Sequence, residues 1–265
     1  AIHLPRQPAG IDAPLARDHV GHVGVAEQRH PVRPHRDRIV QRLRQHGIVI
    51  DKEWDGSYRI PGNQHYRPGT YVVEGDYSQA AFWLSAGSLG RAICCTGLRS
   101  KSSQGDEVIV SLIRDMGGQV EGKTELTACP SELTGRVIDV EDCPDLVPVL
   151  TVLASCAKGI TRIIHAGRVR LKECDRLHAM ATELNKIGGD IEEEDEGLII
   201  HGVGGFTGGT VNGWNDHRIA MALAVASQRC SQPLRIEGAE CVRKSYPEFW
   251  QDFQALGGII QKEGE

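Results

Sequence analysis

Charged side chains gather at a strand-to-helix turn between residues 168 and 176. Four cations and two carboxylates lie within these nine residues, among them Arg168, Lys172, Glu173 and Arg176. Guanidinium and ammonium groups bind carboxylates and phosphates. The first turn of a helix adds free N–H groups and a partial positive charge. This turn therefore predicts a site for a small anion.

A second group of charges follows further along the chain. Asp216, His217 and Arg218 open one predicted helix, and Lys244 precedes another. Arg176 and Arg218 would each lie on the first turn of a separate helix, suited to bind a carboxylate or a phosphate with two hydrogen bonds. The alternative is structural, with the aspartates as helix caps and the lysines as solvated surface. We favour the anion site because cations accumulate at both places.

These residues recur in step with a repeat of about 70 residues. Three series of residues share nearly the same spacing. Glycines at the ends of predicted helices are 71, 71 and 69 residues apart, and one aspartate and one lysine series mark the starts of further predicted helices. The series are Gly47, Gly118, Gly189 and Gly258; Asp76, Asp145 and Asp216; and Lys101, Lys172 and Lys244. We expect three similar units after residue 75, with the aspartates at equivalent helix starts and the glycines in the left-handed region.

Each unit reads as a strand, a helix, a strand, a helix and two further strands. In the middle unit the expected elements are 136–139, 146–157, 161–165, 175–187, 190–191 and 198–201. Alternation of helices and strands predicts an α/β fold with parallel crossovers. The predicted helices 146–157 and 217–226 are apolar nearly all round, which is typical of buried helices. With 78–89, they should pack at a common centre inside the sheets.

The composition excludes several classes of protein. The net charge is −5 and charged residues make up 25%, which does not suit a nucleic-acid binder. No apolar run approaches the length of a membrane span, so no membrane partner is expected. Eight cysteines without Cys-x-x-Cys spacing predict neither a disulfide scaffold nor a zinc site, and a reducing cytoplasm is the default. His165, His178 and His201 lack metal-ligand spacing, so we expect no metal.

The first 51 residues differ from the rest. They contain no lysine and no aromatic residue, but eight arginines, six histidines and five prolines. The segment could be an arm that binds an anionic partner or a poorly packed terminal segment, and we favour the second reading. Periodicity returns near Ile39 and predicts a short helix that ends at Gly47, followed by a strand over residues 48–50.

Five stretches together resemble the 5-enolpyruvylshikimate-3-phosphate (EPSP) synthase family. In the family's order, they are 68–76 (PGTYVVEGD), 171–177 (LKECDRL), 180–184 (MATEL), 215–218 (NDHR) and 244–247 (KSYP). The likeness runs from about Gly56 to Gly258, and residues 1–31 resemble nothing in the family. The resemblance implies an enolpyruvyl-transferase-like domain of three β-α-β-α-β-β repeats around buried helices. It places the C-terminal domain at 75–265, with an atypical arm and a remnant of the N-terminal domain at 1–74.

The resemblance also implies a reaction and a set of site residues. The family transfers the enolpyruvyl group of phosphoenolpyruvate to the 5-hydroxyl of shikimate 3-phosphate and releases phosphate, without cofactor or metal; glyphosate is a further candidate ligand. Asp145 would take the proton from the hydroxyl, Glu173 would handle the proton at the methylene carbon, and Lys172 would contact the hydroxyl or the phosphate. The implied substrate-binding residues are Arg168, Arg176, His217, Arg218 and Lys244.

This sequence departs from the family in its first part. Within residues 1–74, neither the Lys-Ser pair nor the Ser-Ser-Gln stretch of the family's other half-site is found, its two arginines have no matching positions, and the family's Ser-Arg-Pro-Tyr segment appears as 32–35 (VRPH). Half of a two-domain clamp should bind weakly and react slowly. Two alternatives therefore stand beside the synthase: a catalytically inert anion-binding domain, and a relative of the UDP-N-acetylglucosamine enolpyruvyl transferase. The stretches 215–218 and 244–247 favour the shikimate enzyme over that sibling.

Overall fold

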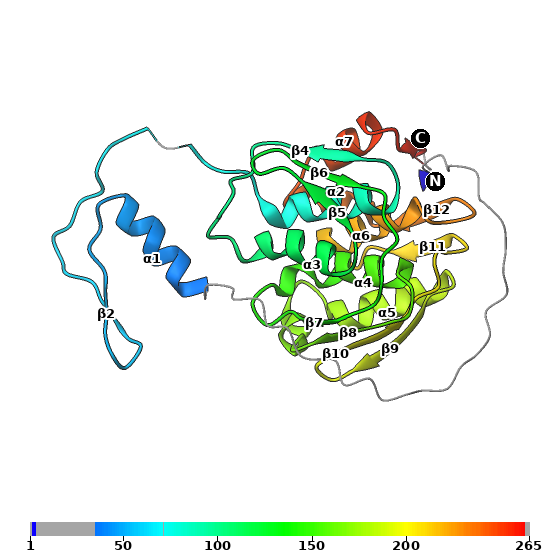
Figure 1. Ribbon diagram of the computed structural model, residues 1–265, viewed down its shortest axis with the longest axis horizontal. Coiled ribbons are helices and arrows are strands. Elements are labelled where there is room, and N and C mark those ends of the chain that lie inside the picture. Colours follow the sequence, from blue (N-terminus) through cyan, green and yellow to red (C-terminus); the bar gives the residue numbers. More distant parts are fainter. Residues whose placement is uncertain (1, 4–34, 71, 263–265) are drawn as a thin grey trace.

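The computed structural model describes residues 2–3, 35–70 and 72–262. The segment that contains α1 (His35–Gln45), β2 (Asp51–Lys52) and β3 (Tyr58–Arg59) extends away from the main body (Figure 1). The helices of the body are α2 (Tyr77–Leu89), α3 (Ile109–Asp115), α4 (Val147–Cys156), α5 (Arg176–Lys186), α6 (His217–Ser227) and α7 (Phe249–Ala255). Short 3₁₀ turns precede several of them: η1 (Gly105–Val108), η2 (Pro144–Leu146), η3 (Gly167–Leu171) and η4 (Ala239–Lys244). Among the described residues, no helix is long and apolar enough to cross a membrane.

Three buried helices form the centre of the body. α2, α4 and α6 pack against one another, and every residue of α6 is buried. Their residues are apolar on nearly all sides, so a helix with only one hidden face would leave apolar surface in water. The expected cluster of three central helices, one from each unit, is confirmed.

Each central helix belongs to a unit with its own sheet. The second unit has a four-stranded sheet in the order β7 (Val137–Asp139), β8 (Ile160–Ile164), β10 (Gly197–His201) and β9 (Asp190–Glu194), with β7 parallel to β8 and the other pairs antiparallel. The third unit follows the order β11 (Gly209–Asn212), β12 (Leu234–Glu237), β1 (Ile2–His3) and β13 (Ile259–Ile260). β1 therefore lies where β10 lies in the second unit.

The first unit has a smaller sheet. Its three strands follow the order β4 (Ile93–Cys95), β6 (Leu126–Cys129) and β5 (Gln119–Glu121). The strand expected ahead of α2 does not form among the described residues, and Val72 and Val73 are exposed there. The α/β repeat is confirmed, with an incomplete first unit and a third unit completed by residues 2–3.

Paired glycines end three helices in the same way, one residue earlier than expected. The left-handed residue is the first of each pair, at Gly117, Gly188 and Gly257, with φ between 93° and 99°. The second glycine, such as Gly189, donates its N–H to the carbonyl five residues earlier, here Leu184 at 2.9 Å. A Cβ on Gly189 would lie 2.8 Å from the same oxygen. The first glycine supplies the left-handed turn and the second the close approach.

The three repeated aspartates lie near helix starts, but one differs from the others. Asp76 and Asp216 are N-caps whose carboxylates accept hydrogen bonds from the N–H groups of Ser78 and Arg218. Asp145 lies inside η2 and caps nothing. Because Pro144 opens that turn and lacks an N–H, the chain enters the helix ahead of Asp145, leaving its carboxylate available for other partners.

The prediction of a strand over residues 48–50 is wrong. Ordered pairing begins later, at β2, which pairs with β3. The backbone of the expected strand bonds to side chains instead: Val49 donates to Gln64 Oε1 at 2.7 Å, and the carbonyl of Ile50 accepts from Arg44 Nε at 3.2 Å. Side chains thus satisfy backbone N–H and C=O groups that would otherwise form hydrogen bonds within a sheet.

Candidate active site

A buried arginine lies at the centre of the charged residues. Arg176, the first residue of α5, is 1% exposed, yet it is in contact with three carboxylates. Its Nε donates to Asp216 Oδ2 at 2.8 Å and its Nη1 to Asp145 Oδ1 at 2.8 Å. Its Nη2 donates to Glu173 Oε2 at 2.6 Å. α5 begins beside the starts of α4 and α6. The guanidinium of Arg176 therefore contacts one carboxylate from its own turn, Glu173, and one from each of the two neighbouring helix starts.

Asp145 is the carboxylate that most of the cations share. Besides Arg176, it lies 3.2 Å from Lys172 Nζ and 3.3 Å from Arg218 Nη2. Burial alone would raise the pKa of Asp145, but the charges of Arg218, Lys172 and Arg176 outweigh it and hold this pKa below its usual value. Asp145 is therefore ionised at neutral pH.

Asp216 behaves in the same way at a fully buried position. Burial opposes its charge, while the hydrogen bond from Arg176 and the positive charge of that residue lower the pKa of Asp216 below the ordinary value. The same carboxylate caps α6 through the N–H of Arg218. Asp216 thus fixes the direction of two arginine-bearing helix starts. The sequence predicts Asp216 as a repeat marker and a helix cap; its equivalence to Asp145 in the repeat is the signal that could have indicated a place in the site.

Arg218 connects the second and third units to the first. Its Nη2 lies 3.1 Å from Ser78 Oγ on the first turn of α2, as well as close to Asp145. The side chain of Arg218 is 10% exposed, whereas that of Lys172 is 34% exposed. Helix starts from all three units therefore meet here, with Lys172 as the most accessible of the three cations.

The remaining expected site residues lie at the edge of this cluster or outside it. His217 Nδ1 is 4.0 Å from Glu173 Oε1, and burial followed by the charge of Arg218 lowers the pKa of His217. Lys244 Nζ donates to the backbone oxygen of Asn215 at 2.6 Å, next to the start of α6. Arg168 is exposed and makes no ion pair with any residue that the structure describes.

The arrangement is balanced in charge. Lys172, Arg176 and Arg218 face Asp145, Glu173 and Asp216 (the charge cluster hereafter), and both oxygens of Asp145 are already in use. An incoming anion reaches Lys172 and the edge of Arg218 first, while Arg176 lies beneath them. Such a site can exchange an internal carboxylate for an external one, and its ionised carboxylates can move protons.

Comparisons with known proteins identify the family of this chain. A family model described as EPSP synthase (3-phosphoshikimate 1-carboxyvinyltransferase) matches residues 13–253. The expectation that residues 1–31 lack any likeness to the family is therefore wrong from residue 13 onward.

Curated relatives carry the same name. The 3-phosphoshikimate 1-carboxyvinyltransferase of Clostridium kluyveri is 51% identical over 227 residues, which are 85% of this chain and 53% of the relative. That of Clostridium acetobutylicum is 48% identical over 226 residues, 85% of this chain and 53% of the relative. The chain thus spans about half the length of the curated relatives it matches.

Solved structures give the same result for the fold. An EPSP synthase from Acinetobacter baumannii superposes with a TM-score of 0.75 and 27% identity, over 88% of this chain and 57% of that one. A second structure of EPSP synthase from that organism gives a TM-score of 0.73 at 25% identity, over 88% and 56%. The charge cluster, the three-unit fold and these matches lead to one conclusion: the chain belongs to the EPSP synthase family.

Proposed function

We propose that this chain supplies one half of the active site of a 3-phosphoshikimate 1-carboxyvinyltransferase. In this reaction the enolpyruvyl group of phosphoenolpyruvate moves to the 5-hydroxyl of shikimate 3-phosphate, and inorganic phosphate leaves. The observation that carries the proposal is the ion pairing of Asp145 with Lys172, Arg176 and Arg218. An ionised carboxylate among three cations is suited both to accept a proton and to lie beside anionic substrates.

Asp145 is our candidate for the base that takes the hydroxyl proton. In the free chain, its pKa is held low by neighbouring cations. When a substrate carboxylate or phosphate draws Lys172 and Arg218 toward itself, that stabilisation weakens and the pKa of Asp145 rises. Substrate binding would thereby make Asp145 a stronger base. Glu173, with its side chain 39% exposed, is the candidate for proton transfer at the methylene carbon.

Anion binding is assigned to the cations around these carboxylates. Lys172 and Arg218 are reachable from solvent, and Arg176 would join the substrate only by exchanging Asp145 or Glu173 for it. Lys244 and the exposed Arg168 would add positive charge at the rim, with His217 adjoining. Glyphosate carries a carboxylate and a phosphonate, so we propose that it competes for the same cations.

We further propose that residues 75–265 are the C-terminal enolpyruvyl-transferase domain, and that residues 1–74 comprise an atypical arm and a remnant of the N-terminal domain. The three-unit repeat supports this division. Residues 2–3 are an exception, because they pair with β12 and β13 and so belong to the sheet of the third unit. A complementary half would complete the charge clamp and exclude water. Without it, the chain would bind anions and turn over nothing, which is the second candidate function.

Binding and turnover can be tested separately. We expect phosphoenolpyruvate to bind the chain alone in the millimolar range, about −4 kcal/mol, and more weakly as salt is raised. Arg218→Ala should weaken binding by about 1.5–3 kcal/mol. Arg162→Ala is the matched control, because Arg162 pairs with Glu194 on the sheet, at 3.1 Å. Equal effects of both substitutions would contradict the site.

The second measurement is phosphate release with both substrates. We expect none above background from the chain alone, and release when the N-terminal half of a Clostridium relative is supplied separately. Restored turnover that requires Asp145 would support the enzyme half. Binding without restored turnover would support the inert anion-binding domain instead.

A further inference from the structure

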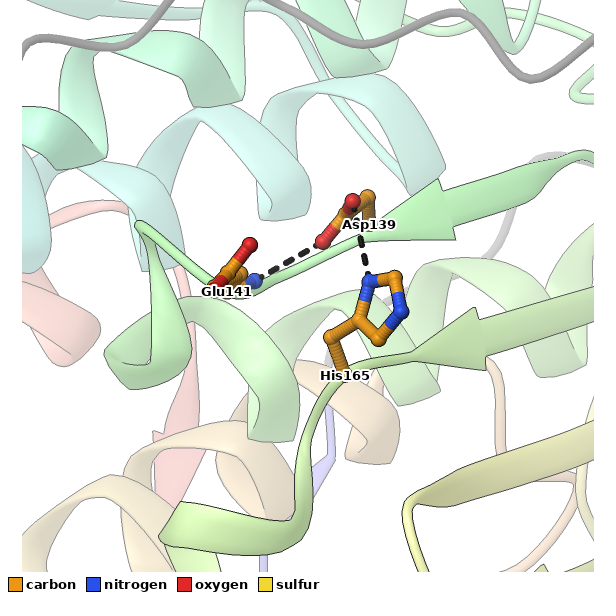
Figure 2. Close-up of side chains that lie close together, drawn as sticks. All are labelled: Asp139, Glu141 and His165. Atoms are coloured by element: carbon orange, nitrogen blue, oxygen red, sulfur yellow. Dashed lines mark hydrogen bonds and ion pairs between the residues drawn. The ribbon is translucent and has the colours of Figure 1, made fainter.

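A second group of polar side chains, none of them part of the charge cluster, lies where two parallel strands end. Asp139 is the last residue of β7, Glu141 follows in the next turn, and His165 comes directly after β8 (Figure 2). Because β7 and β8 are parallel neighbours, with Asp139 opposite Ile164, their carboxyl ends meet at one edge of the sheet. The fold thus places Asp139 beside His165, which follows it by 26 positions in the sequence.

The donor atoms of these three residues are close enough to share one ion. One ligand atom from each lies within 4.8 Å of the others. His165 Nδ1 is 3.0 Å from Asp139 Oδ2. Two ligands at right angles, each about 2.1 Å from a metal, are about 3.0 Å apart, so this pair already has the spacing of adjacent ligands. Glu141 is exposed and can turn toward them.

One oxygen of Asp139 is held in place by the backbone. Asp139 Oδ1 accepts a hydrogen bond from the N–H of Glu141 at 3.0 Å, which leaves Oδ2 directed at His165 (Figure 2). A hydrogen bond to a ligating carboxylate orients it for a metal. Asp142, the residue after Glu141, adds a further exposed carboxylate at the same turn.

We propose that Asp139, Glu141 and His165 bind a divalent transition-metal ion of the series from Mn²⁺ to Zn²⁺. One imidazole and two carboxylates are an N/O donor set that suits these ions better than Ca²⁺ or Cu⁺. The imidazole proton resides on the ring nitrogen that does not bind the ion.

The position of this site gives the ion a structural effect. β7 leads into the turn that carries Asp145, and β8 leads into the turn that carries Lys172 and Glu173. A bound ion would connect the two strand ends from which these turns start. The same two ends are already linked by the hydrogen bond from Val140 N to Ile164 O at 3.1 Å. Metal binding itself is independent of the proposed enzymatic activity.

The test is a titration of the full chain, labelled with ¹⁵N-histidine, with paramagnetic Co²⁺ as the probe. Ring signals of His165, assigned with His165→Gln, should broaden at lower Co²⁺ concentration than those of any other histidine. His178 is the matched control, because its Nδ1 also lies 3.0 Å from a carboxylate oxygen, that of Glu193. Residue-resolved signals separate this site from binding by thiols or by other histidines.

Substitutions of the carboxylates complete the test. Asp139→Asn keeps an acceptor for the Glu141 N–H, and Glu141→Gln changes an exposed side chain. Each should raise the Co²⁺ concentration needed to broaden the His165 signals by about tenfold or more. Broadening of His178 at the same concentration as His165, broadening that both substitutions leave unchanged, or no broadening of His165 would overturn the proposal.

Discussion

Replacing Arg176 with methionine should reveal how much the folded chain depends on this one guanidinium. Methionine fills much of the same space but leaves the partner carboxylates without their shared cation. Asp145 would keep Lys172 and Arg218, and Glu173, with a side chain 39% exposed, would regain water. Asp216, which is 0% exposed, would lose the one lysine or arginine that pairs with it among the described residues. One uncompensated buried carboxylate costs about 3–5 kcal/mol, a large part of a typical free energy of unfolding.

Urea unfolding of the Arg176→Met variant, followed by circular dichroism, measures this loss. Arg170→Met is the matched control, because Arg170 also contacts two carboxylates but with a side chain 24% exposed. We expect the control to lose about 1–2 kcal/mol.

The pH dependence provides a second readout. In the parent chain, burial opposes the charge of Asp216, but the hydrogen bond and the charge of Arg176 outweigh burial and hold the pKa of Asp216 below its ordinary value. The ionised form therefore stabilises the folded chain above about pH 4, and this contribution is lost as the pH falls through the folded pKa. In the variant, burial without Arg176 raises the pKa of Asp216, so protonation relieves the penalty as the pH falls. The difference between variant and parent should shrink from pH 7 toward about pH 4. A loss no larger than that of Arg170→Met, or one independent of pH, would refute the assignment of a neutralising role to Arg176.

Two further substitutions or modifications test local features of the fold. Gly188→Ala should lower the free energy of unfolding by about 1–2 kcal/mol, because Gly188 has a φ of +93°; Gly62→Ala, where φ is ordinary and no atom lies within 4 Å, should be close to neutral. Equal losses from both in urea unfolding would argue against the left-handed helix end. Cys174 should resist iodoacetamide at pH 8, because burial and then the charge of Asp216 raise its pKa to about 12. Peptide mass spectrometry should find the exposed Cys94 alkylated first, and faster labelling of Cys174 would contradict the raised pKa.

Periodic features of the sequence predicted the centre of the fold. The helices around Leu150 and Leu223 have no polar face, so burial on all sides was the stable solution for them, and the glycine pairs placed helix ends to within one residue. Long-range contacts were not predictable in this way. That Arg176 would be buried among three carboxylates depends on which turns meet in space. Its first-turn position alone was compatible with a solvent-facing cation.

The ligand group at Asp139 shows the same limit for metal sites. His165 has no neighbouring histidine or cysteine at a spacing that a single helix or turn would use, so the sequence predicts no metal ligand at this position. Only the parallel pairing of β7 with β8 places it beside Asp139. Strand order within a sheet depends on the whole unit, and local residue spacing does not specify it.

The place of β1 between β12 and β13 affects how the third sheet holds together. In the second unit, the equivalent strand β10 follows β9 after a two-residue turn, 195–196, whereas more than 200 residues separate β1 from its corresponding partner, Ile260 in β13. Closing that longer loop costs about 3–4 kcal/mol more chain entropy. Among the described strands, β13 is hydrogen-bonded only to β1. If β1 detaches, β13 therefore loses its strand partner as well. The amide protons at this edge of the sheet should exchange well before those of the central helices.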